Sequence, residues 1–145
     1  MLKLVFLSSA FYADYASCKE IEKKPLRPHA QVTVDLDGLM FCVPFRSHIA
    51  HQYAIMTDKR NSRGLDFSKA VVITDEAKYI VPDKAPHISE DEFAVVKTIS
   101  DYEVAKRLKA YIGKYKRAKA NPTMERNARL LKYSTLQYFE KEIGL

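Results

Sequence analysis

The chain has 145 residues, of which 47% are hydrophobic and 29% are charged, a composition that excludes global disorder and predicts one domain with its own core. The formal net charge is +6. The basic excess lies in residues 97–145, which carry 12 basic and 5 acidic side chains, against 12 basic and 13 acidic in residues 1–96. A basic flank on a neutral body indicates a polyanionic partner, nucleic acid before membrane.

The chain begins with an apolar stretch and a polar loop. The apolar stretch faintly resembles a signal peptide, but it is too short for the hydrophobic region of one. We therefore expect a first strand at residues 2–7 instead. A short helix is expected at 9–16, followed by a charged, proline-containing loop at 20–28. No apolar run in the sequence approaches the length of a membrane span.

A β-hairpin is the strongest local prediction. Residues 31–36 alternate with a period of two, Asp37-Gly38 follows, and residues 39–43 form an apolar run. Asp-Gly between two such runs indicates a type I′ turn, because both central residues of this turn need a positive φ. Further strands are expected at 53–57, 70–74 and 79–81, and a polar, basic loop at 58–64.

The cysteines indicate the compartment. Cys18 and Cys42 are the only two, and they have neither C-x-x-C nor zinc-site spacing. Cys42 lies within an apolar run and is expected to be a small buried hydrophobe. A secreted disulfide scaffold is therefore excluded, and we expect a protein of the reducing cytoplasm.

The second half of the chain has helical signatures. Ser89-Glu90-Asp91-Glu92 and Ser100-Asp101-Tyr102-Glu103 are capping boxes. The second predicts a helix that ends at Ala120, before Asn121-Pro122, and a last helix is expected at 134–144. The apolar stripe of the long helix recurs at helical spacing and is assigned to the core: Val104, Leu108, Tyr111, Ile112 and Tyr115.

Strands followed by helices predict an α+β fold. We expect a single domain over residues 1–145, mostly β in 1–82 and helical and basic in 89–145. Its core would be a twisted, mostly antiparallel sheet or a partly closed β-barrel with flanking helices.

A dense polar cluster follows the hairpin. Arg46, Ser47, His48, His51 and Tyr53 supply a guanidinium, a hydroxyl, two imidazoles and a phenol within eight residues. RNA cleavage without metal needs such a set, namely a base for the 2′-OH, donors for the charge on phosphorus and an acid for the leaving oxygen. Histidine suits proton transfer near neutral pH, and arginine donates two parallel hydrogen bonds to phosphate. The simpler alternative is a polar loop without catalytic function.

Metal and cofactor sites have little support. His48 and His51 form an H-x-x-H, but no glutamate stands at metalloprotease spacing. The sequence contains no P-loop, G-x-G-x-x-G, EF-hand or G-x-S-x-G motif. We therefore expect neither a metal nor an organic cofactor.

The basic segment at 106–132 holds ten Lys or Arg residues against Glu125 alone. Solvated surface helices usually mix both signs, so this segment favours salt-dependent phosphate contacts over an ordinary solvated face. The aromatic residues of the first helix, Phe11, Tyr12 and Tyr15, either pack the helix or stack on unpaired bases, and packing is the more common outcome.

The order of short motifs along the chain resembles the toxins of type III toxin–antitoxin systems, the ToxN/AbiQ, CptN and TenpN endoribonucleases, and is closest to the CptN/TenpN branch. The motifs cover most of the chain: Phe6-Leu7-Ser8-Ser9, Phe11-Tyr12, the Val32–Val43 hairpin, Pro44-Phe45-Arg46-Ser47, Gly64–Ile73 and Tyr133–Phe139. The resemblance implies a barrel-like antiparallel core similar to MazF-type toxins. It also implies metal-independent RNA cleavage to 2′,3′-cyclic phosphate and 5′-hydroxyl ends.

The resemblance further implies an RNA partner. A repeat-containing antitoxin RNA, folded as a pseudoknot, would lie in a basic groove of the toxin, which processes that RNA and is inhibited by it. Toxin and RNA would alternate in a closed hetero-oligomer. Release of the toxin would cleave cellular or phage RNA and halt growth, a form of antiviral defence without any membrane partner.

Some active-site residues of the family have a counterpart in this sequence, and one does not. The serine after the strand proline corresponds to Ser47 and the polar residue before it to Arg46. The ToxN branch has a lysine two positions after the serine, where this chain has Ile49. The residues that remain open for the lysine's role are His48, His51, Lys59 and Lys69.

The other family positions are less direct. The N-terminal tyrosine corresponds to Tyr12, although an ungapped match gives Phe11. A basic residue ahead of the hairpin corresponds to Arg27 or His29.

The sequence thus predicts an endoribonuclease toxin. Arg46 and Ser47 would contact the scissile phosphate, His48 or His51 would transfer protons, and Tyr12 and Lys59 would position the substrate. The residues expected to bind RNA are Arg27, Lys69, Lys106, Lys109, Lys114, Lys116 and Lys119. The alternatives are a non-catalytic RNA-binding module and a MazF-type mRNA interferase with a protein antitoxin.

Overall fold

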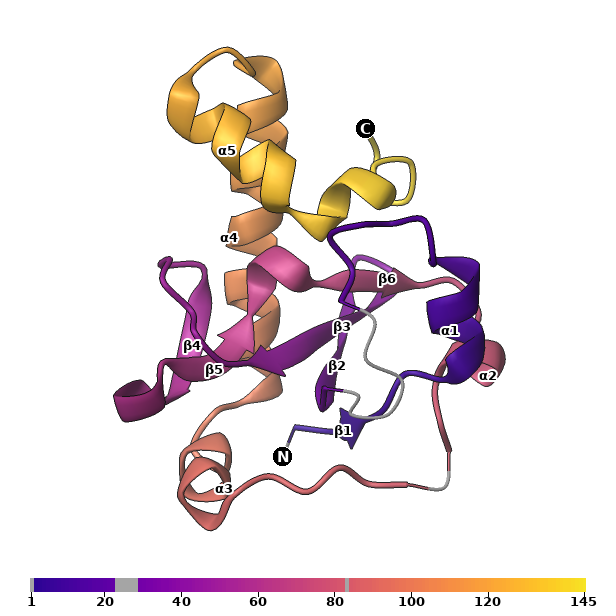
Figure 1. The fold of residues 1–145 in the computed structure, drawn as a ribbon, viewed down its shortest axis with the longest axis vertical. Coiled ribbons are helices and arrows are strands. Elements are labelled where there is room, and N and C mark those ends of the chain that lie inside the picture. The colour runs from indigo at the N-terminus through magenta and orange to yellow at the C-terminus, as the bar shows by residue number, and fades with distance from the viewer. Residues whose placement is uncertain (1, 23–28, 83) are drawn as a thin grey trace.

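The computed structural model describes residues 2–22, 29–82 and 84–145 and has an α+β architecture (Figure 1). Its strands form a six-stranded antiparallel sheet: β1 (Leu4–Val5), β2 (Gln31–Leu36), β3 (Leu39–Arg46), β4 (Ala54–Asp58), β5 (Arg63–Asp66) and β6 (Val71–Ile73). The strand order is β1-β2-β3-β5-β4, and β6 also pairs with β3. Among the described residues no pairing joins β1 to β4, so the sheet is open. The predicted α+β class with an antiparallel sheet is confirmed.

The β2–β3 hairpin is confirmed, and β3 extends beyond the predicted range. Asp37 and Gly38 have φ values of 51° and 79°, as a type I′ turn requires. One edge of β3 pairs with β2, whereas the other pairs first with β6 and then, at Phe45 and Arg46, with β5. The polar cluster therefore starts on the last residue of the central strand.

In the first half, one expected strand is wrong and one strand was missed. The segment 79–81 is not a strand. Asp75 caps the short helix α2 (Glu76–Tyr79) by accepting a hydrogen bond from the Lys78 amide at 3.2 Å, and Ile80 forms only an isolated bridge with Leu7. Strand β5 was missed because its sequence, Arg-Gly-Leu-Asp, has no alternation and begins within the predicted polar loop at 58–64.

The helices of the second half start where the capping boxes predict. Ser89 and Ser100 accept hydrogen bonds at 3.1 Å from the amides of Glu92 and Glu103, opening α3 (Glu90–Val96) and α4 (Asp101–Ala120). The predicted end of α4 at Ala120 is confirmed. Helix α5 (Glu125–Tyr133) was missed, because no side chain caps its first residue and its first turn is polar.

The predicted last helix at 134–144 is wrong in its extent. Only the short 3₁₀ helix η3 (Thr135–Tyr138) forms, and turns follow it. The other short elements are α1 (Ser9–Asp14) and the 3₁₀ helices η1 (Lys59–Asn61) and η2 (Phe67–Lys69). The predicted helix at 9–16 is confirmed in α1, which Ser8 caps through the Phe11 amide.

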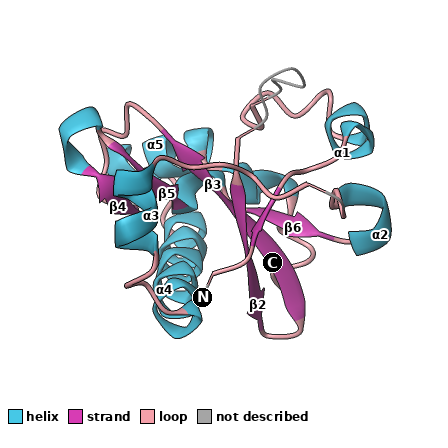
Figure 2. Cartoon of the chain, turned by 90° about the horizontal axis from the view of Figure 1, so that it is seen from below, coloured by secondary structure: helices cyan, strands magenta, loops and turns pink. Residues whose placement is uncertain are grey.

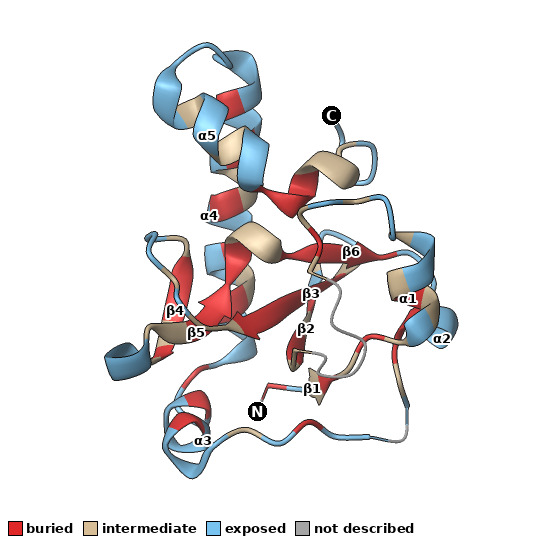
Figure 3. Ribbon diagram, viewed as in Figure 1, coloured by how far each residue is buried: buried red, intermediate tan, exposed pale blue. Residues whose placement is uncertain are grey.

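The core lies between the sheet and the helices (Figure 3). Helix α4 packs against β2 and buries four residues of its predicted apolar stripe, Val104, Leu108, Tyr111 and Tyr115, while the fifth, Ile112, is partly buried. Seen from below, α4 lies on one side of the β2–β3 hairpin, and α1 and α2 lie on the other (Figure 2). Cys42 is buried as predicted. Helix α5 packs back on α4 and stands above the sheet (Figure 1).

Gly64 gives a direct test of the β4–β5 pairing. A Cβ at this position would lie 2.8 Å from the Met56 Cα and even closer to the Ile55 carbonyl oxygen. Because both obstacles are backbone atoms, Gly64→Ala has to separate the strands, and we expect it to lower the free energy of unfolding by about 2 kcal/mol. Gly113→Ala in α4 is the matched control, since its Cβ meets only the flexible end of Arg117, at 3.3 Å. Urea unfolding that shows equal stability of the two variants would contradict the pairing.

Candidate active site

A pocket of about 630 Å³ lies where the end of β3, η2 and α5 meet. The chain after β3 contributes the predicted cluster, namely Arg46, Ser47, His48 and His51. Residues 66–69, around η2, contribute Asp66, Ser68 and Lys69, and α5 contributes Arg126, Arg129, Leu130 and Tyr133. The fold thus brings together the residues that the sequence clustered and two groups that it did not.

Asp66 is the buried centre of the site. Its side chain is 2% exposed and accepts hydrogen bonds from the Ser68 amide at 2.9 Å and the Ser68 hydroxyl at 2.6 Å. Arg46 Nη1 lies 3.5 Å from one carboxylate oxygen and His51 Nε2 lies 3.2 Å from the other. Burial by itself would raise the pKa of Asp66, but the hydrogen bonds from His51 and Ser68 and the charge of Arg46 outweigh it and hold the pKa below its usual value.

His51 is held at both ring nitrogens. Its Nδ1 accepts a hydrogen bond from the Tyr53 amide at 3.0 Å, so this nitrogen carries no proton. The proton of the neutral ring is therefore on Nε2, which faces Asp66 at 3.2 Å and the Ser68 hydroxyl at 3.3 Å. Because both ring nitrogens have hydrogen-bond partners, His51 orients the loop and the carboxylate in this arrangement.

His48 is the imidazole that remains available. Its backbone has a φ of 58°, a left-handed conformation that few residues other than glycine adopt, and strain of this kind concentrates at functional sites. The next amide, of Ile49, donates to the Ser62 carbonyl at 3.0 Å and fixes the turn. His48 lines the pocket, and no described residue forms a hydrogen bond or ion pair with its ring.

Arg46 links two carboxylates across the site. Its Nη2 lies 3.2 Å from Glu22, which also contacts His29 Nε2 at 2.8 Å, and its Nη1 faces Asp66. The buried Nε of Arg46 has no acceptor among the described residues. The carboxylates hold the guanidinium at the pocket wall without using all of its donors.

Lys69 lies in the pocket, whereas Lys59 does not. The half-buried Lys69 extends from η2 and donates a hydrogen bond to the Tyr133 carbonyl at 2.7 Å. Burial, and secondly the charge of Arg46, lower the pKa of its ammonium. Lys59 lies in η1, outside the residues that line this pocket. Of the two lysines that the sequence left open, only Lys69 lines the pocket, and a lowered pKa is common among groups at functional sites.

Tyr12 approaches the site from the core. It lines a separate cavity of about 30 Å³ that shares Glu22, Arg46 and Lys69 with the main pocket. Burial raises the pKa of Tyr12 to about 12, and its ring packs edge-on against the fully buried Phe11, 5.7 Å between centroids. The first helix thus packs its aromatic residues, the more common of the two predicted outcomes. Arg27 lies outside the described residues.

The lysines of α4 do not form one face. Lys114 lies over the Tyr53 ring at 5.2 Å, Lys119 pairs with Glu140 at 3.2 Å, and Lys106, Lys109 and Lys116 are exposed away from the pocket. Two of the three cations of α5, Arg126 and Arg129, line the pocket instead. Both arginines belong to the basic segment at 106–132. Because α5 was not predicted, nothing in the sequence indicated that they line the pocket.

The pocket carries a positive charge. Arg46, Lys69, Arg126 and Arg129 oppose Glu22 and Asp66, a net charge of +2 with neutral histidines. In the described parts of the chain, no group of three His, Cys, Asp or Glu side chains could hold a metal ion. None of the helices described is long and apolar enough to cross a bilayer.

Comparison of the chain with protein-family models, with curated proteins and with solved structures gives no match. A functional assignment therefore has to be argued from the pocket and the sequence motifs.

Proposed function

We propose that this protein is a metal-independent endoribonuclease, the toxin of a type III toxin–antitoxin system. One observation carries the proposal: a single cationic pocket combines Arg46 and Ser47 with an unpartnered imidazole, His48, and a lysine of lowered pKa, Lys69. Its volume of about 630 Å³ suits a nucleotide-sized ligand, and its net positive charge suits a phosphodiester.

The proposed reaction is a transesterification within the RNA. His48 accepts the proton of the ribose 2′-OH as the 2′-oxygen forms a bond to phosphorus. Arg46 and the Ser47 hydroxyl donate hydrogen bonds to the phosphate oxygens as charge develops on them. The bond from phosphorus to the 5′-oxygen breaks, and Lys69 donates a proton to that oxygen. The products are a 2′,3′-cyclic phosphate and a 5′-hydroxyl, and water resets both protein groups.

The other polar residues of the site hold this arrangement in place. Asp66 aims Arg46 and fixes the tautomer of His51, and His51 in turn anchors the loop through the Tyr53 amide. This division of roles favours His48 over His51 as the group that moves a proton.

The proposal extends to the biology that the sequence motifs imply. A cytoplasmic toxin with a MazF-like, partly closed barrel would be inhibited by its own pseudoknot RNA, process that RNA and assemble with it into a closed complex. The open antiparallel sheet with flanking helices and the basic α4–α5 segment are compatible with it.

Cleavage in a metal chelator is the direct test. Purified protein is expected to cleave single-stranded RNA in EDTA and to leave cyclic-phosphate ends. We expect His48→Ala to lower the rate by about 10²–10⁴-fold and Ser47→Ala by about 10²-fold. The control is His87→Ala, an exposed histidine outside this pocket. If Ser47→Ala and His48→Ala both keep full activity, the proposed site is wrong.

The RNA or protein that co-purifies with the chain distinguishes the proposed toxin from the two alternatives. If the proposal is right, protein purified from a host that carries its native locus is expected to co-purify with a discrete small RNA that ends in a cyclic phosphate. Bound RNA with heterogeneous ends would favour the non-catalytic RNA-binding module. A small acidic protein partner would favour a MazF-type interferase.

A further inference from the structure

The main pocket continues into a groove beside α4. Two further hollows of about 350 and 270 Å³ adjoin each other and share Gln52, Tyr53, Lys114 and Arg117, and we call them together the side groove. The larger hollow also shares Tyr53, Arg126 and Leu130 with the main pocket. The pocket and the side groove are therefore neighbouring parts of one depression that runs from the end of β3 to the flank of α4.

The side groove is lined by cations without counter-charges. Lys114 and Arg117 are three residues apart on α4 and so lie on the same side of the helix. Among the described residues, Arg107 and Arg126 complete its basic side chains, and no acidic side chain lines either hollow. Arg107 donates to the Ala54 carbonyl at 2.9 Å and holds the start of β4, which leaves the other three cations for a ligand.

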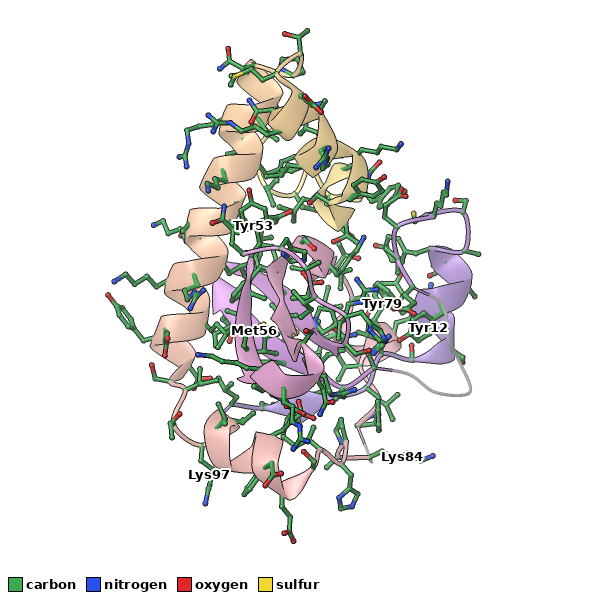
Figure 4. All side chains as sticks on the ribbon, turned by 60° about the vertical axis from the view of Figure 1, so that its left-hand side comes forward. Tyr12, Tyr53, Met56, Tyr79, Lys84 and Lys97 are labelled. Carbon is green, nitrogen blue, oxygen red and sulfur yellow. The ribbon has the colours of Figure 1, made fainter. Side chains whose placement is uncertain are left out.

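An aromatic residue lies at the junction of pocket and groove. Tyr53 is half-buried beside α4 (Figure 4), and its ring centroid is 5.7 Å from that of His51 and 5.3 Å from that of Tyr111. Lys114 Nζ lies 5.2 Å from the same ring. A ring in such a place can stack a base, and stacking of this kind is indifferent to sequence.

We propose that the side groove binds the single strand of RNA that flanks the cleavage position, with Lys114, Arg117 and Arg126 on its phosphates and Tyr53 on a base. This inference rests on the proposed function for the identity of the ligand. Cations beside an aromatic ring are the usual elements of a single-strand site, whereas a duplex offers no base face to Tyr53. The proposal assigns a phosphate contact to Lys114 but none to Lys106 and Lys109, which lie outside the side groove.

Binding of an uncleavable RNA tests the groove independently of catalysis. The probe is a fluorescein-labelled, 2′-O-methylated single strand of about eight nucleotides, measured by anisotropy over a salt series. Lys114→Gln/Arg117→Gln is expected to lower affinity at least about tenfold and to reduce the slope of log K against log salt by about 1.4. The control, Lys84→Gln/Lys97→Gln, removes the same charge from exposed positions far from Tyr53 (Figure 4) and is expected to stay within about threefold of wild type.

Three results would overturn the inference: no loss in the groove variant, an equal loss in the control, or an equal loss of affinity for duplex RNA. Because the methylated probe lacks the nucleophile, its binding is informative even if the wild-type protein cleaves no RNA. Absence of cleavage would reject the nuclease while the groove result stands by itself.

Discussion

Asp66→Asn is expected to lower the free energy of unfolding by about 2–3 kcal/mol, because it removes the charge from a buried carboxylate that faces Arg46, His51 and Ser68. The asparagine has the same shape, so no cavity contributes. Arg46 remains paired with Glu22, which keeps the loss below that of a fully orphaned buried charge. Urea unfolding near neutral pH gives the difference.

The pH dependence of that difference identifies its cause. Because the pKa of Asp66 is lowered in the folded protein, its ionised form stabilises the fold at pH values above the ordinary pKa of about 3.9. That contribution is lost as the pH falls through the lower folded-state pKa. The gap between wild type and Asp66→Asn is therefore expected to shrink below about pH 4. A gap that stays constant into this range would contradict the ionic origin, and Asp35→Asn, an exposed carboxylate on β2, is the control.

Lys69→Ala is expected to slow RNA cleavage by about 10²–10⁴-fold, the usual contribution of a positioned acid. Lys59→Ala tests the other lysine that the sequence proposes, and we expect the wild-type rate, since η1 does not line the pocket. The rates are compared under single-turnover conditions, with unfolding curves to show that both variants fold. Loss of activity in Lys59→Ala with retention in Lys69→Ala would reject the assigned acid.

The pH profile separates proton donation by Lys69 from simple charge attraction. Activity is expected to fall as the pH rises through the lowered pKa of Lys69, because the deprotonated amine has no proton to donate. Lys69→Arg keeps the positive charge but does not deprotonate, and it is expected to restore RNA binding without the rate. If Lys69→Arg cleaves at the wild-type rate, the role of Lys69 is electrostatic only.

Local patterns predicted much of the fold. The Asp37-Gly38 turn, the two serine caps and the stripe from Val104 to Tyr115 are all present, because each depends on residues within a few positions of one another. The missed strand β5 depends instead on its neighbours. Gly64 has to fit against the backbone of Ile55 and Met56, a requirement that no local pattern records.

The site, too, combines residues that are neighbours in the sequence with residues that only the fold brings together. Arg46, Ser47, His48 and His51 lie together in the pocket because they follow one strand. Asp66, Ser68 and Lys69 reach them because β5 pairs with the end of β3 and η2 follows β5 directly. Arg126 and Arg129 reach them because α5 folds back on α4.

Neighbouring residues in the sequence were enough to predict the antiparallel hairpin, the starts of α3 and α4, the polar cluster after β3 and the basic excess of the last 49 residues. The folded chain was needed to show that His51 has partners in the pocket and His48 has none among the described residues, that Lys69 is half-buried near Arg46, and that Arg126 and Arg129 line the pocket. The difference lies in how far apart in the sequence the interacting residues are. Turns and caps depend on neighbouring backbone groups, whereas burial, tautomer and charge pairing depend on residues far away in the chain.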